Sequence, residues 1–179
     1  MKRQTISLSL ALLTCVAVLS TADACQRTEP LIIADVIAET PVIVRARAAR
    51  YAPDSLAVRD DPRANLKTIE FRVYDVLKGD GVPDRIYLGG TLGDRDDLNP
   101  DDVPYPMVRP SGRRGMCHTT YYKREAQFLL FLEERDGQYW VVGEALAPVN
   151  EQVTGGQDPW VLWVRAFNGG VSYGRAGRP

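Results

Sequence analysis

The sequence has little from which metal chemistry or histidine-based catalysis could be built. It contains one histidine, His118, and three cysteines in 179 residues. A single imidazole excludes sites that need several histidine ligands. The sequence also contains no G-x-S-x-G, phosphate-binding-loop or H-E-x-x-H motif. We therefore expect no metal, no cofactor and no enzymatic activity.

The sequence also has no excess of charge of either sign. There are 22 lysines and arginines against 23 aspartates and glutamates, which gives a formal net charge of −1. Nucleic-acid-binding proteins usually carry a marked basic excess, so we do not expect nucleic acid as a partner. With 45% apolar residues, the composition is typical of a globular protein.

The one extended apolar run lies at the N-terminus and has the organisation of a secretory signal peptide. Lys2 and Arg3 precede an apolar run over residues 6–19. Ala22 and Ala24 then supply small residues at the two positions that a signal peptidase reads. The run is too short to span a bilayer comfortably. We expect residues 1–24 to be removed, no transmembrane segment, and a secreted or periplasmic protein.

Removal of residues 1–24 would leave Cys25 and Cys117 as the cysteines of the mature chain. Two cysteines in an exported protein most simply form one disulfide bond, and we expect that bond here. Lipidation of Cys25 is the less favoured alternative. Lipoprotein signals prefer a leucine followed by small neutral residues before the cysteine, whereas Ala22 and Asp23 stand there.

The rest of the chain shows short strand patterns separated by turns. In residues 42–51, one face of an extended chain would carry Val42, Val44, Ala46 and Ala48, and the other would carry Arg45 and Arg47, which is the period of a half-buried strand. The five predicted strands cover residues 42–51, 67–77, 85–88, 126–132 and 139–145. Residues 30–39 predict a short helix, and residues 159–167 fit either a strand or a helical turn.

No alternation of strands with helices is present, so a mainly β fold is favoured. We expect one β-barrel domain over residues 25–170, with a long loop over residues 91–116 and a loose C-terminal tail over residues 171–179. Residues 126–132 are apolar throughout and fit a buried central strand.

The order of these segments resembles a known superfamily. An N-terminal cysteine is followed by a helix with Ala34-Asp35-Val36 and a strand beginning at Phe71, and Cys117 then stands between a long loop and the Phe128-Leu-Leu-Phe131 strand. This pattern resembles the netrin-module and tissue-inhibitor-of-metalloproteinases (TIMP) superfamily, in particular its short secreted bacterial members. The resemblance implies a five-stranded OB-like barrel with its N-terminal segment held on the surface by a disulfide.

The resemblance also implies a mode of action. In the animal inhibitors, the α-amino group and carbonyl oxygen of the first cysteine chelate the zinc of a target metalloprotease. Here those atoms would belong to Cys25, and Gln26 and Arg27 would contact the protease. The animal inhibitors begin Cys-x-Cys, whereas this chain has Arg27 at the third mature position.

An arginine-rich segment precedes Cys117, and two tyrosines follow it. Guanidinium groups suit carboxylate or phosphate partners, and OB-type barrels bind oligosaccharides and other ligands on one face. The residues of this candidate ligand face are Arg109, Arg113, Arg114, Tyr121 and Tyr122. Charge compensation by the neighbouring acidic stretch, residues 94–102, is the simpler interpretation. That stretch lacks the spacing of a calcium-binding loop.

Two further features favour structural roles. Cys117 and His118 are adjacent, and neighbours on an extended strand point to opposite faces, so we expect no nucleophile–base pair. Trp140, Trp160 and Trp163 are expected to pack in the core.

The function predicted from the sequence is therefore binding. We expect an exported interaction module whose partner is an unidentified protein or envelope component. The alternatives are a metalloprotease inhibitor that acts through Cys25, and an enzyme without a recognisable motif.

Overall fold

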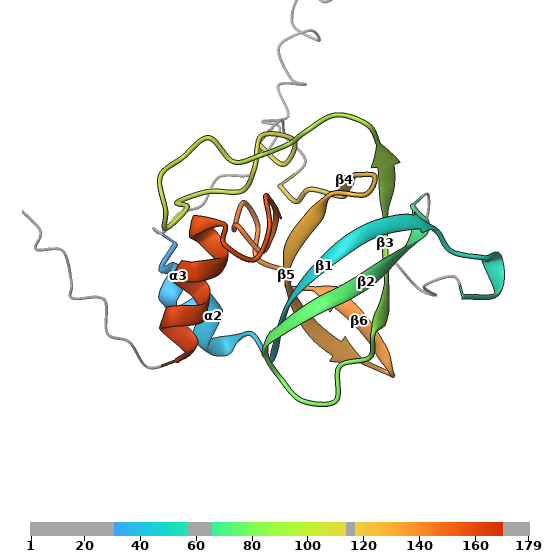
Figure 1. The fold of residues 1–179 in the computed structure, drawn as a ribbon, viewed down its shortest axis with the longest axis horizontal. Helices are drawn as coiled ribbons and strands as arrows, with labels where there is room; N and C mark the ends of the chain where they lie inside the picture. The colour runs from blue at the N-terminus through green and yellow to red at the C-terminus, as the bar shows by residue number, and fades with distance from the viewer. Residues whose placement is uncertain (1–30, 57–65, 114–116, 170–179) are drawn as a thin grey trace, which may run out of the picture.

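The computed structural model describes residues 31–56, 66–113 and 117–169, and their fold is mainly β (Figure 1). The strands are β1 (Val42–Tyr51), β2 (Lys67–Lys78), β3 (Arg85–Gly93), β4 (Tyr121–Lys123), β5 (Gln127–Arg135), β6 (Gln138–Val141) and β7 (Asn150–Val153). Two helices, α2 (Ile33–Glu39) and α3 (Pro159–Asn168), and a 3-10 turn at Asp54–Leu56 complete the described elements. None of the helices in the described ranges is long and apolar enough to cross a membrane.

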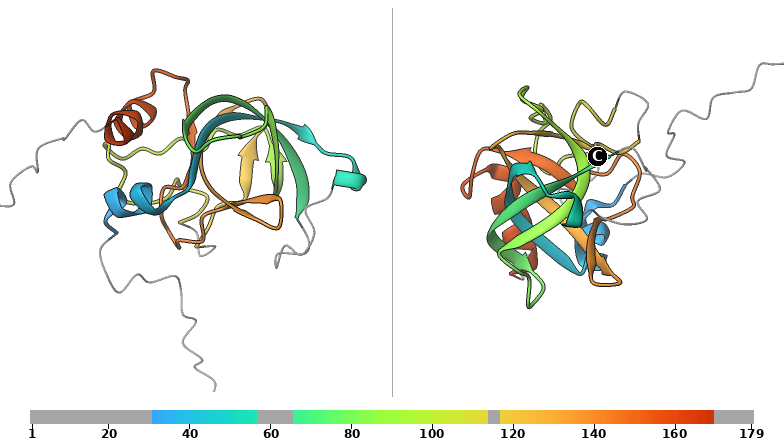
Figure 2. Two further views of the ribbon diagram at one scale, coloured as in Figure 1. Left: turned by 90° about the horizontal axis from the view of Figure 1, so that it is seen from below. Right: turned by 90° about the vertical axis from the view of Figure 1, so that its right-hand side faces the viewer.

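All seven strands belong to one sheet. Their order is β4-β3-β2-β1-β5-β6, and β7 pairs with β5 beside β6. Each pairing is antiparallel except that of β3 with β4. The sheet curves until β3 and β6 approach each other (Figures 1 and 2). Within the described residues no strand ladder joins β3 to β6, so the sheet is open at this place.

The alternating pattern of residues 42–51 forms β1, with the predicted bounds. Val44, Ala46 and Ala48 are fully buried in the concave side of the sheet, while Arg45 lies on the opposite face and pairs with Asp75 of β2 at 2.7 Å. The prediction of a half-buried strand is therefore confirmed.

The β5 strand separates two apolar layers. Phe128, Leu130 and Leu132 point into the concave layer, whereas Leu129 and Phe131 belong to a second layer. All five side chains are fully buried. The prediction of a buried central strand from the unbroken apolar run is confirmed.

The two helices cover the second layer and lie side by side on one side of the sheet (Figures 1 and 2). Residues 159–167 form a helix rather than a strand, because Asp158 accepts a hydrogen bond from the Trp160 N–H at 2.9 Å and Pro159 occupies the first turn. Trp160 is fully buried, and its ring stacks on that of Trp163 at a centroid distance of 5.4 Å. The two rings share a helix face, as the spacing of three requires.

The structure corrects several predicted boundaries. There are seven strands rather than five, because β4 and β7 were not predicted. The β3 strand continues through Gly93 instead of ending at Leu88, and β6 ends at Val141 rather than at residue 145. Helix α2 begins at Ile33, after an extended Ile32, rather than at residue 30.

Gly90 explains why β3 can continue past its two glycines. A Cβ atom at this position would lie 2.7 Å from the Thr120 carbonyl oxygen and 2.7 Å from the Tyr122 ring. The glycine is therefore needed for the close approach of β3 to β4, rather than as the end of the strand.

Candidate functional site

The long loop before Cys117 is fixed to the sheet by a buried polar cluster. Its centre is Arg109, which has no exposed surface. The Arg109 Nη1 lies 2.7 Å from Asp97 Oδ2, and its Nε donates to the Asn150 main-chain oxygen at 2.8 Å. The guanidinium also lies over the rings of Tyr122 and Phe128, at 5.3 and 5.1 Å from their centroids. We call Asp97, Asn99, Arg109, Asn150 and Glu151 the Arg109 cluster.

Glu151 is the second buried acid of this cluster. Its Oε1 accepts a hydrogen bond from the Arg109 main-chain N–H at 2.9 Å, and its Oε2 accepts one from Asn99 Nδ2 at 2.9 Å. Burial raises the pKa of Glu151 to about 7, although the nearby Arg109 charge acts in the opposite direction. Glu151 therefore changes its charge near neutral pH while holding the loop to β7.

Glu151 makes the stability of the protein depend on pH. A carboxyl group whose folded pKa is above its unfolded value of 4.5 stabilises the fold most below pH 4.5, and that contribution is lost as the pH rises toward 7. Between pH 4.5 and 8, this contribution to the free energy of unfolding of the wild type should fall by about 2–3 kcal/mol. We expect Glu151→Gln to lack this fall, because glutamine does not titrate. Urea unfolding across that pH range measures it, with the exposed Glu134→Gln as control. An unchanged pH profile in Glu151→Gln would contradict the assignment.

The acidic stretch is paired with bases. Arg113 Nη2 lies 2.6 Å from Asp101 Oδ2, and Arg109 Nη1 lies 2.7 Å from Asp97 Oδ2. The predicted charge compensation is therefore confirmed for these two arginines. Hydrogen bonds from Lys123 and Gln152, both 2.6 Å long, lower the pKa of Asp96. Among the described residues, no three His, Cys, Asp or Glu side chains are placed to hold a metal ion.

The candidate ligand face predicted from the sequence is not one surface. Arg109 and Tyr122 are buried, so neither faces solvent. Tyr121 is partly exposed, and its hydroxyl accepts a hydrogen bond from the Arg95 N–H at 2.7 Å. Arg113 is engaged with Asp101, and Arg114 lies outside the described residues. A local sequence pattern does not reveal that an arginine is buried, because burial here depends on an acidic partner elsewhere in the chain. The arginines were therefore predicted on the surface.

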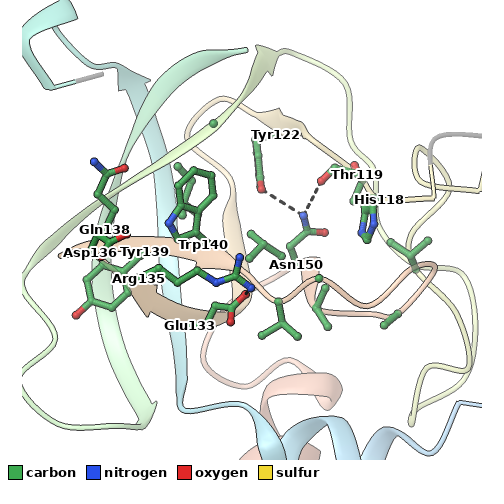
Figure 3. Close-up of a pocket in the computed structure, with 18 residues that line it drawn as sticks. His118, Thr119, Tyr122, Glu133, Arg135, Asp136, Gln138, Tyr139, Trp140 and Asn150 are labelled. Carbon is green, nitrogen blue, oxygen red and sulfur yellow. Dashed lines mark hydrogen bonds and ion pairs between the residues drawn. The ribbon is translucent and has the colours of Figure 1, made fainter. Parts of the chain in front are cut away.

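A cleft lies instead between β3 and β6, with a cavity volume of about 420 Å³ (Figure 3). We call it the β3–β6 cleft. One wall of the cleft is formed by Leu88 and Gly89 of β3, and another by residues 138–143, in and after β6. Tyr122 of β4 and the preceding residues His118 and Thr119 form a third wall. The floor consists of Ala147, Val149 and Asn150. Glu133 and Arg135 form an ion pair at the rim. Trp140, predicted as a core residue, is only partly buried and lines this cleft.

Asn150 joins the cleft to the Arg109 cluster. Its Nδ2 donates to the Thr119 carbonyl at 2.6 Å and to the Tyr122 hydroxyl at 3.2 Å (Figure 3). Its main-chain oxygen accepts a hydrogen bond from Arg109 Nε. The floor of the cleft is thus held rigidly by hydrogen bonds, which suits a preformed binding site.

The β3 edge that faces the cleft is unpaired beyond its contact with β4. The Thr91 N–H donates to the Thr120 carbonyl at 2.8 Å, away from β2. Main-chain groups alternate in direction along a strand, so those of Tyr87 and Gly89 also point away from β2, toward β6.

The β6 edge mirrors this arrangement. The Val142 N–H donates to the Phe131 carbonyl of β5 at 2.9 Å. By the same alternation, the main-chain groups of Tyr139 and Val141 point away from β5, toward β3. No backbone hydrogen bond between described residues crosses the cleft from these four positions. Two unpaired strand edges therefore face each other.

Comparison of the chain with known protein families, curated proteins and solved structures finds no match. The resemblance to the netrin-module and TIMP superfamily stays a prediction. Cys25, Gln26 and Arg27, on which the inhibitor mechanism depends, lie outside the described residues, as do residues 1–24 and 171–179.

Proposed function

We propose that this chain is an exported binding module whose partner occupies the β3–β6 cleft. The observation that carries the proposal is the cavity of about 420 Å³ between two strand edges that lack hydrogen-bond partners across it. The ionisable rim groups Glu133 and Arg135 neutralise each other, which favours recognition over catalysis.

Export and the Cys25–Cys117 disulfide are part of the same proposal. The signal-peptide pattern over residues 1–24 supports export. Cys25 and Cys117 are the two cysteines left after removal of residues 1–24, and two cysteines in an exported chain most simply pair with each other. An oxidising compartment outside the cytoplasm is where such a bond persists.

Filling the cleft tests the proposed function. Gly143 lines the cleft and is exposed, and a Cβ atom there would meet nothing within 4 Å, so Gly143→Leu adds a bulky side chain at the cleft without a Cβ clash. We expect the mature wild-type chain to retain a specific partner from the envelope of the producing cell, and Gly143→Leu to retain at least tenfold less.

Gly156→Ala is the matched control, because Gly156 lies outside the cleft lining and its added Cβ would make only ordinary contacts with Arg45, at 3.5 Å or more. Equal thermal unfolding midpoints would show that each variant is folded. Equal retention of the partner by Gly143→Leu and the wild type, or no retained partner at all, would overturn the proposal.

A further inference from the structure

We propose that the outer face of β1, β2 and β3 carries a binding site for the phosphate group of a phosphomonoester, formed by three arginines around Glu70. The arginines are Arg50, Arg72 and Arg85. None of these four residues lines the β3–β6 cleft. The inference therefore goes beyond the proposed function and does not depend on it.

The register of the sheet brings the four residues together on one face. Glu70 and Arg72 of β2 alternate with Phe71, whose ring belongs to the concave apolar layer, so both lie on the opposite, outer face. Glu70 is the register partner of Arg50 in β1. Arg72 is the register partner of Arg85 in β3. The site therefore spans three strands that lie side by side in the sheet (Figure 1).

Glu70 is a buried carboxylate at the centre of the three arginines, and its side chain is only 3% exposed. Its Oε2 accepts hydrogen bonds from Arg50 Nε at 3.2 Å and from Arg50 Nη2 at 3.0 Å. Its Oε1 lies 3.8 Å from the Nε atoms of both Arg72 and Arg85. One carboxylate thus faces three guanidinium groups and balances the charge of one, which leaves a local charge of +2.

The strand register also places like charges directly opposite each other. Arg72 has Arg85 as its partner in β3 and Arg47 as its partner in β1. Like charges at opposite positions destabilise a sheet. Arg47 is balanced by Glu125 at 2.8 Å, whereas Glu70 is the one acid among the described residues that forms an ion pair with Arg72 or Arg85. A bound anion would reduce this repulsion.

The guanidinium groups are accessible to a ligand and are already oriented. The side chains of Arg50, Arg72 and Arg85 are 60, 47 and 56% exposed. Arg72 and Arg85 face Glu70 through Nε, and no described residue forms a hydrogen bond with their Nη atoms. The N–H groups of guanidinium match the oxygens of phosphate. Because Glu70 restricts the arginine side chains beforehand, a ligand pays less of the ordering cost of binding.

The charge of the site favours a phosphomonoester over a carboxylate. A phosphomonoester carries close to two negative charges at neutral pH and has three acceptor oxygens. Together with Glu70, it would balance the three guanidinium groups, whereas a single carboxylate would leave one of them unbalanced. The phosphate group could belong to a soluble molecule or to a lipid headgroup, since both present the same chemistry.

The test is titration of the mature wild-type chain with methyl phosphate, followed by NMR at the Nε–Hε groups of its arginines. We expect saturable shifts at Arg72 and Arg85, and none when sodium chloride is added to the same ionic strength. Arg85→Gln should weaken the affinity at least fivefold. Arg165→Gln is the matched control, because Arg165 is 47% exposed and pairs at 3.5 Å with Asp75, outside the site. This control should bind methyl phosphate as the wild type does.

The pH dependence of binding tests the charge balance. The second pKa of a phosphomonoester is about 6, so lowering the pH from 7.5 to 5 should weaken the binding of methyl phosphate about fivefold. Sulfate keeps both charges over this range and should bind with nearly the same affinity at the two pH values. Equal affinity for methyl phosphate at both pH values would overturn the assignment of a dianionic ligand.

Vesicles of phosphatidylcholine with and without phosphatidic acid distinguish the two sources of the phosphate group. Binding that requires phosphatidic acid and is lost in Arg85→Gln would assign a lipid headgroup, and no binding to either vesicle would assign a soluble phosphomonoester. The site is wrong if sodium chloride causes the same shifts, or if Arg85→Gln binds methyl phosphate as tightly as the wild type does. Neither result bears on partner retention by the cleft, which Gly143→Leu tests separately.

Discussion

Replacing Arg109 by methionine is expected to lower the free energy of unfolding by about 3–5 kcal/mol, because removing one member of a buried ion pair leaves the other uncompensated. The Asp97 carboxylate would lose the Arg109 Nη1 at 2.7 Å, and the Asn150 carbonyl would lose its donor at 2.8 Å. Methionine conserves much of the side-chain volume, so the loss reports on polar contacts rather than on a cavity. Urea unfolding monitored by circular dichroism measures it.

Arg113→Met is the matched control. Arg113 also pairs with an aspartate of the loop, but its side chain and that of Asp101 are each 27% exposed. Water screens such a pair, so we expect a loss of about 1 kcal/mol or less. Adding Asp97→Asn to Arg109→Met should recover part of the larger loss. Equal losses in the two single variants would show that burial of the Arg109 cluster does not stabilise the fold.

Trp160→Ala is expected to have an effect of similar size, about 3–5 kcal/mol. The Trp160 ring is fully buried between Tyr105, Phe131 and Trp163, at centroid distances of 5.1, 6.3 and 5.4 Å. Its removal leaves a cavity between α3 and the sheet that these rings cannot fill by small shifts. Chemical unfolding measures the loss.

Leu162→Ala in the same helix is the control. Leu162 is 39% exposed, and alanine is at least as good a helix former, so we expect a change within about 0.5 kcal/mol. If Trp160→Ala were no more destabilising than Leu162→Ala, the assignment of α3 as an anchor of the second apolar layer would be wrong.

The parts of the fold that the sequence predicted are those in which burial follows local periodicity. Val44, Ala46 and Ala48 alternate with arginines, so β1 was predicted with its observed bounds. Strand β7, with the sequence Asn-Glu-Gln-Val, was missed because its polar residues are buried only through partners such as Arg109, 41 residues earlier in the chain. No local pattern encodes that partner.

The candidate site was less predictable for a related reason. The β3–β6 cleft is bounded by strand edges, and which backbone groups lack a partner depends on the register of the whole sheet. Trp140 was the one local indication of the cleft in the sequence. An aromatic residue on a short edge strand can remain partly exposed, and Trp140 does so where it lines the cleft. The arginine-rich segment predicted a ligand face instead, although Arg109 is buried and holds the loop to the sheet.

The position of β1 at the centre of the sheet affects how the chain folds during its synthesis. Val42 of β1 pairs with Leu132 of β5, so the middle of the sheet joins segments that are far apart in the chain. Contacts of such large sequence separation form slowly, because a long loop must close first. A nascent chain cannot complete its central ladder until β5 has been synthesised. Until then, the edge of β1 that pairs with β5 stays uncovered, although β2 and β3 can already pair on the other side of β1.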